Sequence, residues 1–133
     1  MAKLSDKQAE LFRGKNWGTV VTLRKDGSPH STPVWIDTDG ENVIFNTSVG
    51  RAKERYLRQD PRASLIVVDP HDPYRWVSVA GRAELSTEGA DAEIDKLAKK
   101  YLGKDEYPWR NPSEQRIKVR ITAEKVEATG LGD

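Results

Sequence analysis

Two cationic side chains occur where they oppose the electrostatics of the local backbone. Arg51 and Lys53 fall in the first turn of a short helix predicted over residues 51–58. The dipole of a helix already places about half a positive charge at that end, where acidic residues are preferred. Local conflicts of this kind are typical of functional sites. A bound anion would neutralise the excess positive charge, so the pattern indicates a phosphate-binding site. The alternative is a basic helix that only faces solvent.

Small polar residues precede this helix. Asn46, Thr47 and Ser48 are predicted to form a turn after an apolar strand. Free backbone N–H groups at the start of the helix would then point to the same place as the two cations. Arg55 and Arg58 share a helix face with Arg51. They are available either for neighbouring carboxylates or for a longer acidic tail on the ligand.

Tryptophan supplies the second chemical signal, with four residues in a chain of 133. Trp17 and Trp35 lie in predicted strands and are expected in the core. Trp76 and Trp109 lie beside loops rich in proline, tyrosine and arginine. Core packing is the ordinary role of such rings, but rings beside an anion site suit a flat aromatic ligand. The combination indicates a phosphorylated ring system such as a flavin.

The motifs of several other kinds of site are missing from the sequence. There is no cysteine, so disulfides and thiolate catalysis are excluded. The two histidines, His30 and His71, have no partner at metal-ligand spacing, and we expect no metal site. The sequence contains neither the G-x-S-x-G nucleophile elbow of serine hydrolases nor the G-x-G-x-x-G and P-loop motifs of the nucleotide-binding folds. The sequence therefore assigns no catalytic side chain.

Composition bounds the class of protein. The length predicts one domain over residues 1–133, and a mean hydropathy of −0.74 predicts no membrane association. The net charge of +1 gives no general attraction to nucleic acid. The absence of cysteine and of a signal-peptide core leads us to expect a cytoplasmic protein.

Periodicity and turn residues predict a mainly β fold with about three helices. Pro29 and Pro33 predict an edge strand, and Gly81 predicts a bulge in the middle of a strand. The apolar strand over residues 63–69 is expected to be buried on both faces. Such spacing favours an antiparallel barrel with helices covering its ends. The six expected strands are residues 17–23, 29–36, 42–47, 63–69, 76–85 and 116–126, and residues 37–40 are expected to form a turn. A first helix is expected to begin with a capping box of Ser5 and Gln8 and to end at Gly14. The later helices are 51–58, which Asp60 and Pro61 should end, and 87–101.

From residue 17 to residue 126, the chain resembles the pyridoxamine 5′-phosphate oxidase-like superfamily, also called the FMN-binding split barrel. Within it, the chain is most similar to the small reductases that use the deazaflavin coenzyme F420. The resemblance is strongest in R-A-K-x-R-x-L-R-x-D-P-R, an apolar strand, and then D-P-x-x-P-Y-R-W. It implies a six-stranded antiparallel split β-barrel that forms a homodimer, with two cofactor sites at the subunit interface.

The resemblance also implies which residues contact the cofactor. The phosphate would lie against the helix after the third strand, the ring would lie along the second strand, and the second subunit would close the site. Mapped residue by residue, these positions are Asn46, Thr47, Ser48, Arg51 and Lys53 for the phosphate, Thr32, Pro33, Val34 and Trp35 for the ring, and Trp76 and Trp109 for the closing subunit.

The implied activity is hydride transfer from reduced F420 to an unsaturated small-molecule acceptor, which the sequence does not identify. Alternatives are an FMN-dependent oxidoreductase of the same fold and a non-catalytic F420 carrier. A nucleic-acid-binding module is disfavoured by the balanced charge. Oxidation of pyridoxamine phosphate is not expected, because the chain ends soon after its last predicted strand.

Overall fold

The computed structural model describes residues 2–132, which form three helices and seven strands. In chain order these are α1 (Asp6–Arg13), β1 (Trp17–Leu23), β2 (Pro29–Trp35), β3 (Asp37–Thr38), β4 (Val43–Ser48), α2 (Ala52–Gln59), β5 (Arg62–Asp69), β6 (Asp72–Ser86), α3 (Ala90–Leu102) and β7 (Arg116–Thr129). No helix within the described residues is long and apolar enough to cross a bilayer.

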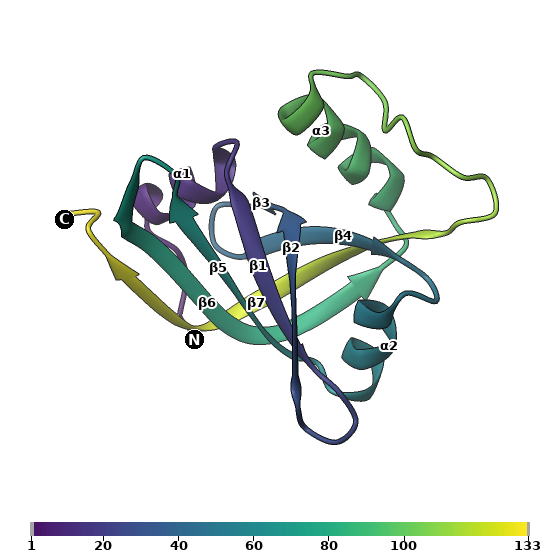
Figure 1. Ribbon diagram of the computed structural model, residues 1–133, viewed down its shortest axis with the longest axis horizontal. Helices are drawn as coiled ribbons and strands as arrows, with labels where there is room; N and C mark the ends of the chain where they lie inside the picture. The colour runs from purple at the N-terminus through teal and green to yellow at the C-terminus, as the bar shows by residue number, and fades with distance from the viewer. Residues whose placement is uncertain (1, 133) are drawn as a thin grey trace.

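All the strands join one antiparallel sheet in the order β2-β1-β5-β6-β7-β4-β3. The sheet curls on itself, with α1 on one side of the view and α2 and α3 on the other (Figure 1). The expected antiparallel barrel-type fold is confirmed, but the strand count is seven rather than six. Asp37 and Thr38, expected in a turn, pair with Ile44 and Val43 as a short edge strand.

The predicted bulge at Gly81 is confirmed. The pairing of β6 with β7 shifts register between Ala80 and Gly81. A Cβ atom at residue 81 would lie 1.8 Å from the carbonyl oxygen of Thr122. Glycine therefore lets the two long strands approach closely at the point where the sheet bends.

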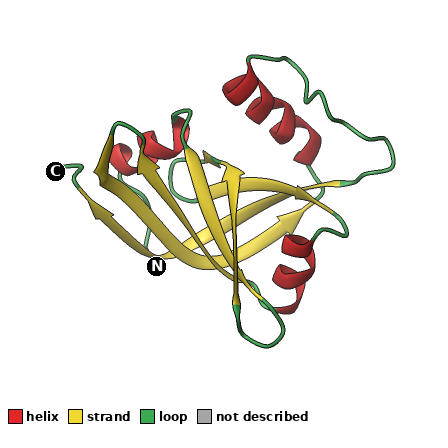
Figure 2. Cartoon of the chain, in the orientation of Figure 1, coloured by secondary structure: helices red, strands yellow, loops and turns green. Residues whose placement is uncertain are grey.

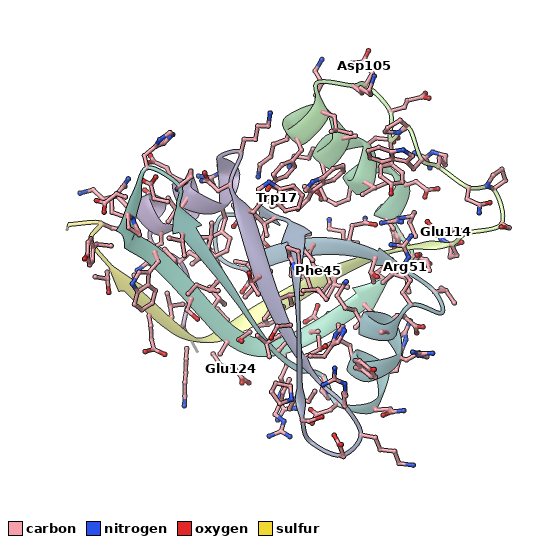
Figure 3. All side chains as sticks on the ribbon, in the orientation of Figure 1. Trp17, Phe45, Arg51, Asp105, Glu114 and Glu124 are labelled. Carbon is pink, nitrogen blue, oxygen red and sulfur yellow. The ribbon has the colours of Figure 1, made fainter. Side chains whose placement is uncertain are left out.

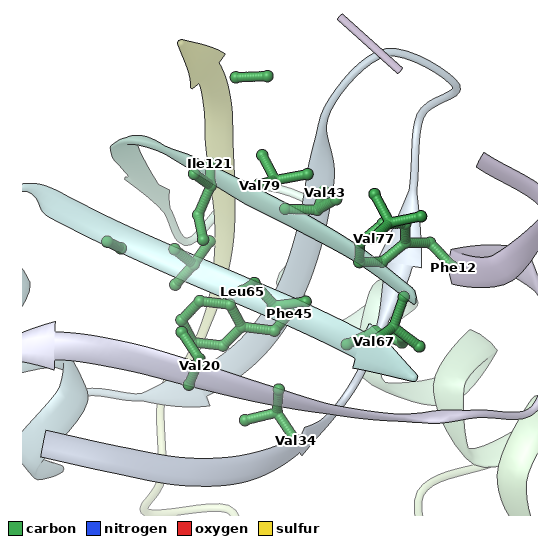
Figure 4. Packing of buried hydrophobic residues seen from close by; sticks show 14 of the residues in the cluster. Phe12, Val20, Val34, Val43, Phe45, Leu65, Val67, Val77, Val79 and Ile121 are labelled. Atoms are coloured by element: carbon green, nitrogen blue, oxygen red, sulfur yellow. The ribbon is translucent and has the colours of Figure 1, made fainter. Parts of the chain in front are cut away.

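The core fills the concave side of the curled sheet. Phe45 of β4 and Phe12 of α1 are fully buried there among branched aliphatic side chains (Figure 4). A smaller cluster lies beneath α3, where Ile94, Leu97 and Tyr101 pack with Trp35 and Tyr107. This second cluster packs α3, and the segment that follows it, against the end of β2.

Local signals placed the first two helices correctly. Ser5 and Gln8 form the predicted capping box at the start of α1. Helix α2 ends at Asp60, before Pro61, as expected. At its other end Arg51 is the N-cap residue, and its side chain makes no capping hydrogen bond.

The strand expected over residues 42–47 is confirmed as β4, so the polar turn predicted over residues 46–48 is wrong. These residues continue β4 and pair with Lys118, Ile117 and Arg116 of β7. The chain instead turns at Val49 and Gly50, where Gly50 adopts a φ of 90° that disfavours other residues. The long partner strand keeps the polar residues extended, a tertiary effect that local propensity does not register.

The ends of several other elements, and the burial of strand β5, also differ from those expected from the sequence. Strand β2 lies at the sheet edge as predicted, whereas β5 is not buried on both faces. Its Leu65 and Val67 are buried, but Ile66 is half-buried and Val68 is exposed, because no helix within residues 2–132 covers that side. We call this side the outer face. Strand β6 begins at residue 72, α3 at residue 90, and β7 continues to residue 129.

Candidate functional site

A cavity of about 390 Å³ opens between the sheet edge, the start of α2, helix α3 and the segment before β7. Figure 3 shows Trp17 near α3 and Arg51 near the start of α2, at two separate places around this region. The lining residues are Trp17, Pro33, Val34, Trp35, Asn46, Thr47, Arg51, Lys53, Ile94, Leu97, Tyr107, Trp109 and Arg116.

The cavity brings together most of the residues that the sequence nominated. From β2 it gathers Pro33, Val34 and Trp35; the others are Asn46, Thr47, Arg51, Lys53 and Trp109. Thr32 does not line the cavity, but its hydroxyl oxygen accepts a hydrogen bond from the Lys53 ammonium at 3.2 Å. Thus segments distant in sequence converge at one place.

Two nominated residues lie elsewhere in this chain. The side chain of Ser48 is buried outside the cavity, although its carbonyl oxygen accepts the Arg51 N–H in the turn. Trp76 lies on β6, paired with Val68 of β5 and Thr129 of β7, and it does not line the cavity. It is half-buried on the outer face.

Lys53 is a half-buried cation with no carboxylate partner among the described residues. Burial lowers the pKa of its ammonium, and the positive charge of Arg51 lowers that pKa further. Its observed contact is the neutral hydroxyl of Thr32. Partial burial of an unpaired ammonium costs free energy, because the charge loses contact with water. A bound anion beside Lys53 would offset this cost.

Arg51 and Arg116 share a carboxylate. Glu114 lies 3.0 Å from the guanidinium of Arg51 and 2.7 Å from that of Arg116. The hydrogen bond from Arg116 is the main cause that lowers the pKa of Glu114, so this carboxyl remains ionised. Figure 3 shows Arg51 and Glu114 side by side at the start of α2. Glu114 thus pairs with two of the three cations that line the cavity, Arg51 and Arg116, and Lys53 leaves positive charge in excess.

Unpartnered polar groups lie beside these cations. The hydroxyl oxygens of Thr47 and Ser48 are buried, and neither has a hydrogen-bond partner in the described part of the chain. Buried polar atoms are usually satisfied, so an exception calls for a missing partner. With Lys53 and the uncapped start of α2, the Thr47 hydroxyl fits an oxyanion such as a phosphate. We call Thr47, Arg51, Lys53 and Arg116 the cationic end of the cavity.

Asn46 has a structural task besides lining the cavity. Its amide nitrogen donates to the carbonyl of Ala90, 2.9 Å away, at the start of α3. Its amide oxygen accepts from Nε of Arg116 at 2.8 Å. Because both ends of the amide are occupied, Asn46 ties β4 to α3 and holds Arg116 in place.

The other end of the cavity is aromatic. The Tyr107 ring meets Trp35 edge-on at 6.2 Å and Trp109 edge-on at 5.7 Å. Trp17 is 6.5 Å from Trp35 and is 61% exposed, contrary to the expected core position, while Trp109 is 63% exposed. We call Trp17, Trp35, Tyr107 and Trp109 the aromatic end. Rings with a free face suit a flat ligand.

A buried tyrosine supports this end from behind. Tyr101 of α3 stacks on Trp35 with an angle of 6° between the rings, 5.2 Å apart. Its hydroxyl accepts from the N–H of Ile36 and donates to the carbonyl of Asn16. Burial raises the pKa of this hydroxyl to about 12, so it stays a neutral donor. The stack fixes the orientation of Trp35.

A carboxyl pair joins α3 to the edge of the sheet. Burial, and then the neighbouring Asp37, raise the pKa of Glu93 to about 7. Burial alone would raise the pKa of Asp37 too, but hydrogen bonds from Glu93 and Lys96 outweigh it and lower that pKa. Oε2 of Glu93 has no hydrogen-bond partner within residues 2–132. A proton shared with Asp37 would satisfy this oxygen, so the pair is best described as holding one proton.

This pair predicts a pH-dependent stability. Because the folded protein holds the Glu93 proton more tightly than the unfolded chain, its contribution is complete below the unfolded pKa of 4.5 and is lost as pH rises through about 7. We expect E93Q, which keeps an amide donor towards Asp37, to remove up to about 3 kcal/mol of the stability lost between pH 5 and pH 8. Urea unfolding at both pH values measures this. An unchanged difference in the variant would contradict the assignment.

The sequence did not nominate five of the lining residues. Trp17 was expected in the core, and Tyr107 was noted only as a neighbour of Trp109. Ile94 and Leu97 follow the ordinary apolar pattern of a helix, which does not distinguish a cavity wall from a core. Arg116 opens a strand, where a cation has no special meaning. Only the fold reveals that these side chains meet.

Comparison with known proteins places this geometry in context. Residues 4–130 match the family described as pyridoxamine 5′-phosphate oxidase. An F420H2-dependent biliverdin reductase of Mycobacterium tuberculosis is 27% identical over 127 residues, which cover 93% of this chain and 87% of that protein.

Solved structures agree with this match. A structure described as an F420 reductase has a TM-score of 0.80 and 25% identity, covering 93% of this chain and 98% of that one. A conserved hypothetical protein of Mycobacterium tuberculosis has a TM-score of 0.76 and 26% identity, covering 96% and 86% of the two chains.

Proposed function

The chain belongs to the pyridoxamine 5′-phosphate oxidase family, and from this premise we propose that it is an F420-dependent reductase. In this proposal the enzyme transfers a hydride from the reduced deazaflavin to an unsaturated organic acceptor. The names of two similar proteins, an F420H2-dependent biliverdin reductase and an F420 reductase, support the choice of coenzyme. The acceptor of this chain is a separate question.

The observation that carries the proposal is the position of Lys53. This half-buried ammonium has no carboxylate partner among the described residues, and it lines the same cavity as Thr47, whose buried hydroxyl is unsatisfied. Lys53 and Trp35 line the same cavity of about 390 Å³, one at its cationic end and the other at its aromatic end. An anion-binding end and an aromatic end in one cavity suit a ring joined to a phosphate by a short linker.

In this proposal the residues of the chain bind and orient, while F420 when bound supplies the hydride chemistry. Lys53 and Arg51 donate charge-assisted hydrogen bonds to the phosphate. The Thr47 hydroxyl donates a third. Trp35, held by the Tyr101 stack, packs against the ring, and Trp109 limits the entry of water. Pro33 has no N–H donor, which leaves backbone groups near it available to the ring edge.

We also propose that the protein acts as a homodimer. The outer face carries the half-buried Ile66 and Trp76 and the exposed Val68. A hollow of about 280 Å³ on the same face is lined mainly by small and aliphatic residues of β1, β5 and β6, together with Arg62 of β5 and with Glu124 and Lys125 of β7. A second copy would bury this surface and bring its Trp76 towards the cofactor of the first.

The coenzyme could instead be FMN, whose single phosphate fits the same cationic end. Arg55 makes no ion pair among the described residues and is exposed, whereas Arg58 pairs with Glu54 at 2.9 Å. A free cation one helical turn along α2 from Arg51 favours a ligand with an acidic tail, as in F420. A non-catalytic F420 carrier would use the same contacts without turnover.

Parallel titrations with F420 and FMN test the proposal. We expect F420 to bind more tightly, and the reduced form to be oxidised rapidly when a suitable quinone or enone is added. Tighter binding of FMN would favour the flavin alternative. Tight F420 binding without turnover across an acceptor panel would favour the carrier. Binding of neither coenzyme would refute both the reductase and the carrier.

A further inference from the structure

Trp109, one of the two exposed rings of the aromatic end, is carried by a segment with few hydrogen bonds between backbone groups. Residues 103–115 run as a long loop from α3 to β7 (Figure 2). Among the described residues, the hydrogen bonds between backbone groups in this loop occur near its two ends: from residues 103 and 104 to α3, from Glu114 to Asn111, and from Val49 to Gln115. The middle of the loop, which carries Tyr107 and Trp109, is therefore positioned by side chains.

One carboxylate holds both sides of Trp109. Oδ1 of Asp95, on α3, accepts the backbone N–H of Tyr107 at 2.9 Å. The same oxygen accepts a hydrogen bond from the guanidinium of Arg110 at 2.5 Å. Residues 107 and 110 flank Trp109 in the sequence, so Asp95 fixes the chain before and after this ring. Its neighbour Ile94 lines the cavity, which ties the loop to the cavity wall.

Other contacts of the loop do not constrain Trp109 to the same degree. The Tyr107 ring packs on Trp35, lies 5.2 Å from the guanidinium carbon of Arg116 and meets the Trp109 ring edge-on. This ring contact depends on the position of residue 107, whose backbone N–H is bound by Asp95. Asp91 contacts Arg110 at 3.3 Å but makes no hydrogen bond to the loop backbone. Salt bridges between exposed groups contribute little, so the bond from the backbone of Tyr107 distinguishes Asp95 from Asp91.

We propose that Asp95 is a positioning residue that holds Trp109 over the aromatic end of the cavity. Through Trp109 it governs how quickly a bound ring ligand leaves and how tightly an acceptor fits against that ring. The part concerning the ring ligand rests on the proposed function; the placement of Trp109 does not. Asp95 itself does not line the cavity and takes no chemical part in the reaction.

The placement is tested without any ligand. We expect D95A to increase quenching of tryptophan fluorescence by acrylamide, because the loop carrying Trp109 is released. The matched control D91A removes a carboxylate from the same helix that contacts the same arginine, and it should leave quenching near the wild-type value. The increase should vanish when D95A is made in a W109F background. Equal quenching in D95A and D91A would overturn the proposal. If D95A does not fold, D95L, which has no hydrogen-bond acceptor, replaces it.

The consequence for binding is tested by stopped-flow mixing with F420. Loss of the Asp95 contacts should raise the dissociation rate about tenfold, the effect of one charge-assisted hydrogen bond, with little change in the association rate. With an acceptor, the KM should rise while kcat changes little, and D95E should recover part of the loss. An unchanged dissociation rate would overturn the proposal. If the wild-type protein binds no F420, the proposed function fails, and quenching alone decides the role of Asp95.

Discussion

Replacing Lys53 with methionine should weaken F420 binding by about 30- to 150-fold without lowering the stability of the fold. The ammonium is half-buried, its pKa is lowered by burial, and no carboxylate within the described chain neutralises it. A charge-assisted hydrogen bond to a phosphate is worth roughly 2–3 kcal/mol, which corresponds to that loss of affinity. Removing an unpaired buried charge should leave the unfolding free energy equal or higher.

The opposite effects on binding and stability make this substitution informative. Isothermal titration measures the affinity, and thermal unfolding without ligand measures the stability. K99M is a matched control, because Lys99 is an exposed lysine on α3 that pairs with Asp105 outside the cavity. Adding R51A to K53M should weaken binding further. Unchanged affinity in the K53M and R51A double variant would remove the phosphate assignment.

A lysine in place of Ile66 should convert a dimer into monomers and abolish coenzyme binding. Ile66 lies in the middle of the outer face, paired with Thr19 of β1 and Ser78 of β6. Burying an unpaired ammonium in an interface costs several kcal/mol, enough to weaken association by more than about 100-fold. Since Trp76 is on the same face, a cofactor site completed by a second copy would be lost with the dimer.

Sedimentation velocity and a coenzyme titration on the same sample measure both consequences. L102K is the control, since Leu102 is an exposed apolar residue at the end of α3, away from the outer face. It should remain dimeric and bind normally. A wild-type protein that is monomeric, or an I66K variant that is monomeric yet binds F420 at full strength, would contradict the shared site.

Local rules anticipated much of the fold. The capping box at Ser5, the end of α2 at Asp60, the edge position of β2 and the bulge at Gly81 all follow from residue chemistry over a few positions. The errors lie where a distant strand decides. Residues 46–48 are extended because β7 pairs with them, and Asp37 joins the sheet because it meets Ile44.

Some features of the candidate site were likewise predictable from local sequence, and others were not. The conflict of cations with a helix start singled out Arg51 and Lys53 from sequence, and the fold brings both to one cavity. The pairing of Arg51 with Glu114, and the role of Asn46 as a brace for Arg116, could not be anticipated, because each joins segments about 60 to 70 residues apart. Arg51 and Arg116 both pair with Glu114, so Lys53 is the cation of the cavity whose charge no carboxylate within the described residues neutralises.

The most direct measurement compares F420 with its deazaflavin riboside, which has the same ring but no phosphate. Both ligands reach the aromatic end, and only F420 presents an anion to Lys53 and Thr47. We expect F420 to bind at least about 100-fold more tightly to the wild-type protein and this preference to fall at least tenfold in K53M. Equal affinities for the two ligands in the wild-type protein would show that the cationic end does not bind a phosphate.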